Sequence, residues 1–238
     1  MKAIIWWLKL SLFTAVFISC NEENTEEHLI ERGTVVDSQG HVYATVKIGD
    51  QWWMAENLAV NTFNDGTSIS EILPDAPDSV WANVTGPAYT FVNDTLYGLL
   101  YNHAVIQDPR GIAPAGWHVP TDDDWKKLEE TIGVSNANSL GWRGETEAED
   151  LVPKFSIGWL EGSYLFGTGK YGFEALPGGC ILFNGERSSQ GNTAFWWTSS
   201  SNQDEAYYRY IDANKKQIFR QKTYTNYGMS IRCVKINL

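Results

Sequence analysis

Short runs of β-forming residues alternating with glycine-containing turns constrain this chain more than any other feature of its sequence. The clearest example is GTVVDSQGHVYATVKIGDQWWMAENL, residues 33–58, in which SQG at 38–40 marks one reversal and GD at 49–50 a second. We expect three short strands there, joined as a meander. The chain has 21 glycines and 11 tryptophans, which favours many turns between short strands over a helical bundle.

Further strands are expected along the rest of the chain. The segments 206–211 and 217–221 predict a hairpin across the turn DANKK. Residues 61–95 are dense in turn-forming residues and predict mostly loop, with short strands around Trp81 and from Tyr89 to Val92.

The stretch GWHVPTDDDWKKLEE, residues 116–130, predicts the start of a helix. Thr121 stands at the N-cap position, and Asp124 follows three residues later, where the acid of a capping box belongs. The aspartates at 122–124 fall in the first turn, where the helix dipole stabilises carboxylates. A second helix is expected around residues 146–154. The predicted fold class is therefore α+β, with antiparallel sheets, one or two flanking helices and long loops.

A metal site or an acid/base pair is the alternative interpretation of the same stretch. Consecutive helical residues point about 100° apart, so the three aspartates cannot converge on one ion without other ligands. His118 lies between Trp117 and a proline turn, and a lone histidine in such a place is typical of packing rather than catalysis. We therefore expect no metal and no cofactor.

The N-terminus has the features of a bacterial export signal. A basic start and a short apolar run lead to Ser19 and Cys20, and a cysteine directly after the small residue distinguishes a lipoprotein signal. The sequence FISC resembles the lipobox, although Phe17 replaces its usual leucine. We expect residues 1–19 to be removed as a signal peptide and Cys20 to carry the lipid. A soluble secreted protein with an incidental Cys20 is the alternative.

The segment after Cys20 predicts both a tether and a location. Residues 20–32 are polar and acidic, which is typical of a flexible spacer. Their glutamates also resemble the acidic signals that send some Gram-negative lipoproteins to the outer face of the outer membrane. We expect a protein anchored there by its lipid and facing the exterior, with the periplasmic face as the alternative. Residues 33–238 remain for one large domain.

The net charge limits the classes of partner that the chain can bind. The net charge of -11 repels phosphates, so nucleic acid is excluded as a partner, whereas the membrane is expected as one through the lipid.

Two cysteines, Cys180 and Cys233, remain after lipidation of Cys20, in a compartment where disulfides form. A bridge between them is expected, and two buried free thiols are the alternative.

Five ordered blocks resemble a known family. They are DSQGHVYATVKIGDQWWMAENL, YNHAVIQDPRGIAPAGWHVPTDDDWKKLE, YGFEALPGG, FWWTSSS and IRCVK, and together they resemble the Fibrobacter succinogenes major paralogous domain of exported Gram-negative proteins. Their order is also similar to that of C-type-lectin-like domains. This resemblance implies that the N- and C-terminal strands pair and that residues 121–132 form a flanking helix. The Glu-Pro-Asn and Trp-Asn-Asp motifs of calcium-dependent sugar binding are absent.

Two tryptophan doublets stand where the family has single tryptophans. The resemblance places Trp53 and Trp197 in the core. Because neighbours on a strand face opposite sides, we expect Trp52 and Trp196 to point outward, where an indole can stack on a sugar ring or a partner surface. A sheet covered on both faces, which would bury both members of a doublet, is the alternative.

The expected function is that of a cell-surface, non-enzymatic module that binds a glycan or a protein. No Gly-x-Ser-x-Gly elbow, His-Glu-x-x-His or phosphate-binding loop is present, so no enzyme is expected. A structural or accessory subunit of a surface assembly is the first alternative. An oxidase similar to the formylglycine-generating type is the second. It would need a copper-binding cysteine pair, and only Cys180 and Cys233 are available.

Overall fold

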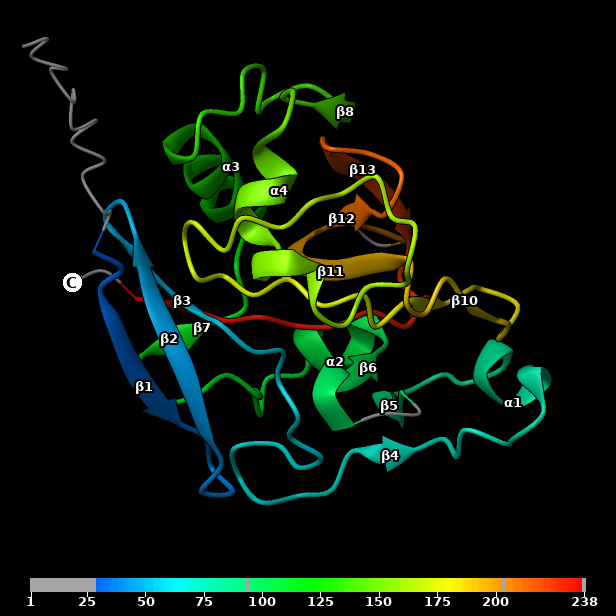
Figure 1. Ribbon diagram of the computed structural model, residues 1–238. Helices are drawn as coiled ribbons and strands as arrows, with labels where there is room; N and C mark the ends of the chain where they lie inside the picture. Colours follow the sequence, from blue (N-terminus) through cyan, green and yellow to red (C-terminus); the bar gives the residue numbers. More distant parts are fainter. Residues whose placement is uncertain (1–28, 93–94, 203, 237–238) are drawn as a thin grey trace, which may run out of the picture.

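The computed structural model describes residues 29–92, 95–202 and 204–236, which form mainly antiparallel strands with few helices (Figure 1). The helical segments are α1 (Asp78–Ala82), α2 (His103–Gln107), α3 (Asp122–Thr131), α4 (Glu147–Leu151) and the 3₁₀ turns η1 (Thr95–Tyr97) and η2 (Lys154–Ser156). The predicted α+β class is confirmed. Within these residues no helix combines the length and the apolar character needed to cross a bilayer. The signal peptide, Cys20 and most of the tether lie outside the described residues.

The first sheet joins the two ends of the described chain. Its strands, in spatial order, are β1 (Arg32–Val36), β2 (Val42–Ile48), β3 (Gln51–Met54), β14 (Val234–Lys235) and β7 (Trp117–His118). The meander predicted for residues 33–58 is confirmed. Val234 pairs with Trp53 on one side and with His118 on the other, so β14 closes the sheet that β1 to β3 begin. In Figure 1 the red C-terminal segment runs beside the blue N-terminal strands.

The second sheet contains the predicted hairpin. Its strands, in spatial order, are β11 (Thr193–Ser201), β12 (Glu205–Asp212), β13 (Ile218–Tyr224) and β8 (Gly141–Arg143), all antiparallel. The hairpin across DANKK is confirmed as β12 and β13. The smaller sheets are β4 (Ser70–Glu71) with β5 (Ala88–Phe91) and β6 (Leu99–Tyr101), and β9 (Cys180–Ile181) with β10 (Arg187–Ser188).

Helix α3 begins where its sequence predicts. The Thr121 hydroxyl accepts a hydrogen bond from the Asp124 amide at 3.1 Å, and the Asp124 carboxylate accepts one from the Thr121 amide at 2.8 Å, which completes a capping box. Trp125 and Leu128 lie one turn apart on the inner face and are buried. The predicted second helix is also present, as α4.

A cluster of large rings forms the centre of the core between the two main sheets. Trp53 of β3, Trp125 of α3, Trp196 of β11 and Phe173 pack edge to face or tilted, with ring centroids 5.0 to 6.0 Å apart. All are buried. Such rings bury about 150 to 250 Å² each and dominate the energetics of a core, so this cluster holds α3 between the sheets.

The strand predicted around Trp81 is wrong. Residues 78–82 form α1, and Pro77 stands at its N-cap. The Trp81 ring is buried, and its Nε1 donates to the Asn226 carbonyl at 2.8 Å. The β propensity of an aromatic residue therefore gives way to a tertiary contact with a segment 145 residues away.

Candidate functional site

The acidic start of α3 forms a helix cap and an ion-pair cluster. Asp124 caps the helix and lies 2.9 Å from His118 Nε2. Burial alone would raise the pKa of Asp124, but hydrogen bonds from His118 and Thr121 outweigh it and lower the pKa. No three histidine, cysteine or acidic side chains are grouped as metal ligands among the described residues. The predicted helix start is confirmed by the capping box of Thr121 and Asp124.

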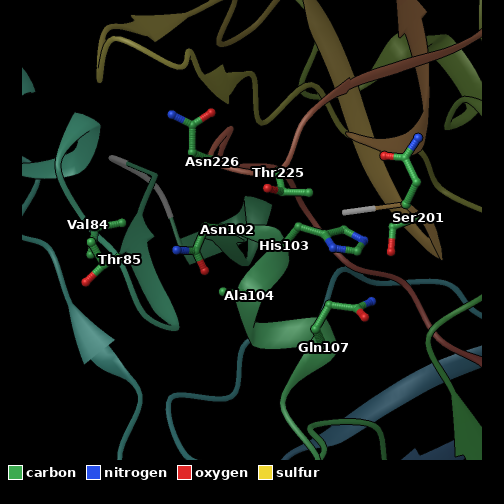
Figure 2. Close-up of a pocket in the computed structure, with 10 residues that line it drawn as sticks. Val84, Thr85, Asn102, His103, Ala104, Gln107, Ser201, Thr225 and Asn226 are labelled. Carbon is green, nitrogen blue, oxygen red and sulfur yellow. The ribbon is translucent and has the colours of Figure 1, made fainter. Parts of the chain in front are cut away.

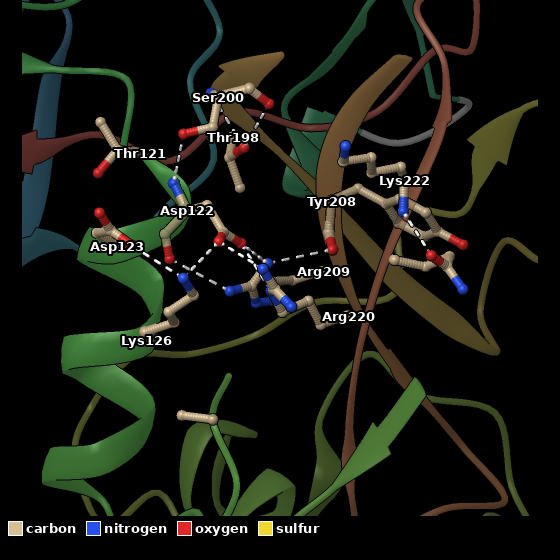
Figure 3. Close-up of polar contacts among 12 residues, drawn as sticks. Thr121, Asp122, Asp123, Lys126, Thr198, Ser200, Tyr208, Arg209, Arg220 and Lys222 are labelled. Carbon is tan, nitrogen blue, oxygen red and sulfur yellow. Dashed lines mark hydrogen bonds and ion pairs between the residues drawn. The ribbon is translucent and has the colours of Figure 1, made fainter. Parts of the chain in front are cut away.

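Asp122 has a role that the sequence did not indicate. Its carboxylate receives Arg209 Nη1 at 2.9 Å, Arg220 Nη2 at 2.7 Å and Lys126 Nζ at 2.9 Å (Figure 3). Burial by itself would raise the pKa of Asp122, but these three cations hold it well below its usual range. Asp123, in contrast, has a side chain 89% exposed. The sequence predicts that the helix dipole stabilises the carboxylates of both Asp122 and Asp123. Only Asp123 has the solvent exposure that this role implies.

Glu129, further along α3, extends this cluster of ion pairs. Arg209 Nε donates to Glu129 Oε1 at 2.7 Å, and Arg143 pairs with both carboxylate oxygens. Arg143, Arg209 and Glu129 have side chains at most 1% exposed. The cluster of Asp122, Glu129 and these cations thus ties α3 to β8, β12 and β13, and its role is to hold the second sheet in place.

The two tryptophan doublets differ in exposure. Trp53 and Trp197 are buried as predicted. Trp52 is half-buried on the outer face of β3, beside Gly33. The prediction that Trp196 points outward is wrong, because it is 1% exposed and its Nε1 donates to Asn57 Oδ1 at 3.0 Å. At this point α3 and the ring cluster cover one face of β11, while Trp197 packs into a second core on the other.

The predicted disulfide is wrong as well. Cys180 and Cys233 are free thiols, and both are buried in the same core. Cys180 lies on β9, whereas Cys233 precedes β14 and its carbonyl accepts from the Met54 amide at 3.0 Å, so backbone pairing holds the two in different sheets. Burial raises the pKa of Cys180 to about 12 and also raises that of Cys233. Both thiols are therefore protonated, which suits packing and not redox chemistry.

A row of aromatic rings crosses the face of the second sheet on which Trp197 also lies, and part of this row packs against the second core. Phe195 of β11 is directly opposite Tyr210 of β12, Tyr210 is opposite Phe219 of β13, and Phe219 is opposite Trp142 of β8. Successive ring centroids are 5.0, 4.5 and 5.0 Å apart. Tyr208 stacks beside Tyr210 at 6.0 Å with an interplanar angle of 10°. All five are half-buried, so each ring keeps part of its surface open to solvent. We call these five residues the aromatic row.

A groove of about 330 Å³ adjoins the aromatic row. Phe195, Tyr208 and Tyr210 form its apolar wall, and the residues that add polar groups are Ser188, Ser189, Thr193, Asp212 and Thr223. Burial raises the pKa of both tyrosines, so their phenols stay protonated at neutral pH and can donate or accept hydrogen bonds.

The groove can stack on and hydrogen-bond a ligand. Hydrolysis of a glycosidic bond uses a pair of carboxylic acids, and the described residues that line the groove include one carboxylic acid. Asp212 is the one acidic residue among the described residues that line the groove. Both oxygens of its carboxylate accept hydrogen bonds within the chain, Oδ1 from the Asn214 amide at 2.8 Å and Oδ2 from the Thr193 hydroxyl at 3.3 Å. The arrangement therefore suits binding.

Sequence reasoning did not find this site. The segment EAYYRYID shows tyrosines at alternate positions 208 and 210, which is the signal of one ring-bearing strand face. The partners Phe195, Phe219 and Trp142 depend on the register between strands far apart in the sequence. The prediction from the tryptophan doublets instead chose Trp196. Its neighbour Phe195 is the residue whose ring is partly exposed.

The chain belongs to the Fibrobacter succinogenes major domain family, whose model matches residues 46–235. The match includes β3, β7 and β14 of the first sheet, the whole second sheet, α3 and the aromatic row, whereas β1 and most of β2 precede it. Neither the search among curated proteins nor the search among solved structures found a match.

Proposed function

We propose that this member of the Fibrobacter succinogenes major domain family is a non-enzymatic, lipid-anchored surface protein that binds a glycan along its aromatic row and groove. The observation that carries the proposal is the alignment of Phe195, Tyr210, Phe219 and Trp142 across four strands, next to a groove with hydroxyls and one carboxylate. The rings of the row are tilted against one another, by 35° to 69° between successive rings, and their exposed parts offer apolar surface to the C–H faces of sugar rings. Polar groups at the side of the row would fix the orientation of the sugars.

Rigid placement of the rings supports this function. Each ring lies on a strand, and each is held by neighbours at 4.5 to 6.3 Å. Binding then costs little ordering of the protein, because the side chains are already confined in the free state. An open row also suits an extended chain of sugars better than a single small molecule, which prefers an enclosed pocket.

The anchor and the fold relation are part of the same proposal. Cys20 would carry the lipid and residues 20–32 would separate the domain from the membrane, with the domain facing the exterior. The relation to C-type-lectin-like domains is supported in part, because β14 shares the first sheet with β1 to β3. The C-terminal strand pairs there with β3 and β7, however, and not with the N-terminal strand β1. The half-buried Trp52 remains a further stacking candidate, on a different sheet from the row.

A structural or accessory subunit is the second candidate function. The observation in its favour is that β1 lies at an edge of the first sheet and pairs with β2 alone among the described strands. An edge strand can accept a strand from another chain. The oxidase alternative finds no support, because it needs two reactive thiols and both cysteines are buried in different sheets.

Binding to polysaccharides tests the proposal directly. The Cys20→Ser chain would be screened against soluble and insoluble polysaccharides, and any binder would be titrated calorimetrically. Tyr210→Ala and Trp142→Ala should each weaken binding by about tenfold or more, which corresponds to about 1.4 kcal/mol. Tyr164→Ala is the matched control, since Tyr164 is 75% exposed and lies outside the row.

Two results would contradict it. The first is the absence of binding to any polysaccharide in the screen. The second is binding that both row variants retain at full strength while circular dichroism shows them folded. If the screen is negative and a surface protein binds at β1 instead, the structural candidate replaces this one.

A further inference from the structure

A second pocket, of about 370 Å³, lies at the start of α2 (Figure 2). Asn102, His103 and Gln107 contribute from one side, Ser201 from the end of β11, and Thr225 and Asn226 from the segment after β13. The segment 223–227 separates it from the aromatic groove, because Thr223 and Tyr227 line that groove whereas Thr225 and Asn226 line this pocket. The two are therefore distinct sites.

The lining of this pocket is polar and uncharged. Amides, hydroxyls and one imidazole supply its polar groups, and no lysine, arginine, aspartate or glutamate is among the described residues that line it. This is unusual on a chain in which 20% of residues are charged and the net charge is -11. A bound cation would find no carboxylate here, and a bound anion would find no basic side chain.

His103 presents an unused hydrogen-bond acceptor. Its side chain is fully buried, and its Nε2 lies 2.9 Å from the Thr198 carbonyl oxygen. A carbonyl oxygen only accepts, so Nε2 carries the proton and Nδ1 is left as an acceptor. Nδ1 is buried and has no hydrogen-bond partner within the described structure. Edge-to-face packing on Trp197, with ring centroids 5.1 Å apart, fixes the ring in this orientation.

The protonation of His103 keeps that acceptor available. Burial lowers the pKa of His103, and the bond to the Thr198 carbonyl offsets this only in part. The imidazole is therefore neutral at physiological pH.

Asn226 provides a second acceptor of the same kind. Its Nδ2 donates to the Phe183 carbonyl at 3.2 Å, which leaves Oδ1 as an acceptor. Oδ1 is buried without a hydrogen-bond partner in the part of the chain that the structure describes. The Asn226 carbonyl is held by Trp81 Nε1, so the residue is fixed in position. His103 and Asn226 both line this pocket. Buried polar atoms normally have partners, so their two unpaired acceptors are the groups that a donor-bearing ligand held here would satisfy.

We propose that this pocket binds a neutral, hydroxyl-rich ligand, a single sugar unit or a similar polyol, through hydroxyl groups donated to His103 Nδ1 and Asn226 Oδ1. Ser201, Thr225 and Gln107 at the mouth would supply further hydrogen bonds to the remaining hydroxyls. The pocket volume, at the lower end of the usual range for small-ligand sites, suits one such unit. The proposal does not require ligand binding at the aromatic row.

The proposal is tested by the NMR signal of His103 Nδ1. In the Cys20→Ser chain, the other histidines are replaced by glutamine so that a long-range proton–nitrogen NMR spectrum reports His103 alone. Glucose, galactose, mannose, N-acetylglucosamine and glycerol are added in turn, with choline and inorganic phosphate as charged probes. At least one neutral probe should move the Nδ1 signal in a saturable manner towards that of a hydrogen-bonded nitrogen, and neither charged probe should do so.

Variants then separate this site from the aromatic groove. Asn226→Ala should weaken binding of the active probe by about tenfold or more, whereas the exposed turn variant Asn214→Ala should leave it unchanged. Tyr210→Ala, which removes a ring of the aromatic row, should also leave the Nδ1 response unchanged. A response that depends on Tyr210 would overturn the proposal of a separate site.

Other outcomes would overturn the proposal as well. One is an Nδ1 signal that no neutral probe moves. Another is a signal that already has the hydrogen-bonded position in the free protein and stays there, since an ordered water then satisfies the nitrogen. A response to choline or phosphate equal to that of the sugars would exclude a neutral ligand. Polysaccharide binding at the row could succeed or fail independently of all three.

Discussion

The carboxylate of Asp122 is shared by three cations although its residue is the first of a helix. Two of them, Arg209 and Arg220, come from the second sheet, and Arg209 is completely buried. Removing one partner of a buried ion pair leaves an uncompensated charge away from water, which costs far more than the loss of a surface pair. The residue therefore matters through its partners and not through the helix dipole.

Asp122→Asn should lower the free energy of unfolding by about 3 kcal/mol, since it leaves the arginines without one of their two carboxylates. Asp123→Asn, at an exposed neighbouring position, should change it by less than about 0.5 kcal/mol. Urea denaturation of the two variants measures the difference. Equal effects would show that the ion pairs with Asp122 contribute nothing beyond the dipole.

The lowered pKa of Asp122 predicts how the free energy of unfolding changes at acidic pH. The pKa of Asp122 is lowered in the folded state, so its contribution is complete above the unfolded value, about 3.9, and is lost as the pH falls through the lower folded value.

The buried cysteines predict the opposite dependence at alkaline pH. The pKa of Cys180 is raised to about 12 in the folded state, against about 8.5 in an unfolded chain. Its contribution to stability is complete below about 8.5 and is lost as the pH rises towards 12. Tyrosines and lysines ionise from about pH 10, so the interval from 8.5 to 10 reports mainly the cysteines. Unfolding free energies should decline there in the parent chain.

Two controls check this interpretation of the cysteines. Cys180→Ala should make the decline between pH 8.5 and 10 shallower. A thiol reagent should label neither Cys180 nor Cys233 at pH 8 until denaturant unfolds the protein. Rapid labelling of the native state would show that the thiols are accessible, contrary to their burial.

Local sequence signals determine where helix α3 begins. Thr121 and Asp124 form both hydrogen bonds of the capping box. Thr121→Ala should therefore lower the unfolding free energy by about 1 kcal/mol, whereas Thr121→Ser, which keeps the hydroxyl, should cost much less. Thermal denaturation of both variants makes the comparison. An alanine variant as stable as the parent would mean that the cap is redundant with the ion pairs of Asp122.

Elements with local determinants could be predicted, and those set by pairing over long distances could not. The capping box, the meander and the DANKK hairpin each depend on residues close together in the sequence. The burial of Trp196 depends instead on whether α3 covers β11. The alignment of the aromatic row depends on the register of β8 against β13. Strand alternation correctly separates Trp196 from Trp197, but only tertiary packing decides that both are buried.

The C-terminal segment joins the two halves of the fold. Val234 pairs with β3 and β7 in the first sheet, and Ser230 bridges to Trp196 in the second. Between them, the fully buried Arg232 donates to Asn57, which also receives the Trp196 indole. Loss of this segment would expose both cores, so the two main sheets should unfold together rather than as separate units.

A lipid on Cys20 would hold this domain at the membrane. If Cys20 carries the lipid, Cys20→Ser should move the protein from the membrane fraction to the soluble fraction and abolish labelling by a fatty-acid analogue. A single acyl chain binds a membrane only marginally, so retention requires the several chains of a lipoprotein. Cys180→Ser is the matched control, because its buried thiol is not an acylation site and labelling should persist. Unchanged membrane retention of Cys20→Ser would refute the anchor, and the polysaccharide-binding test would remain valid without it.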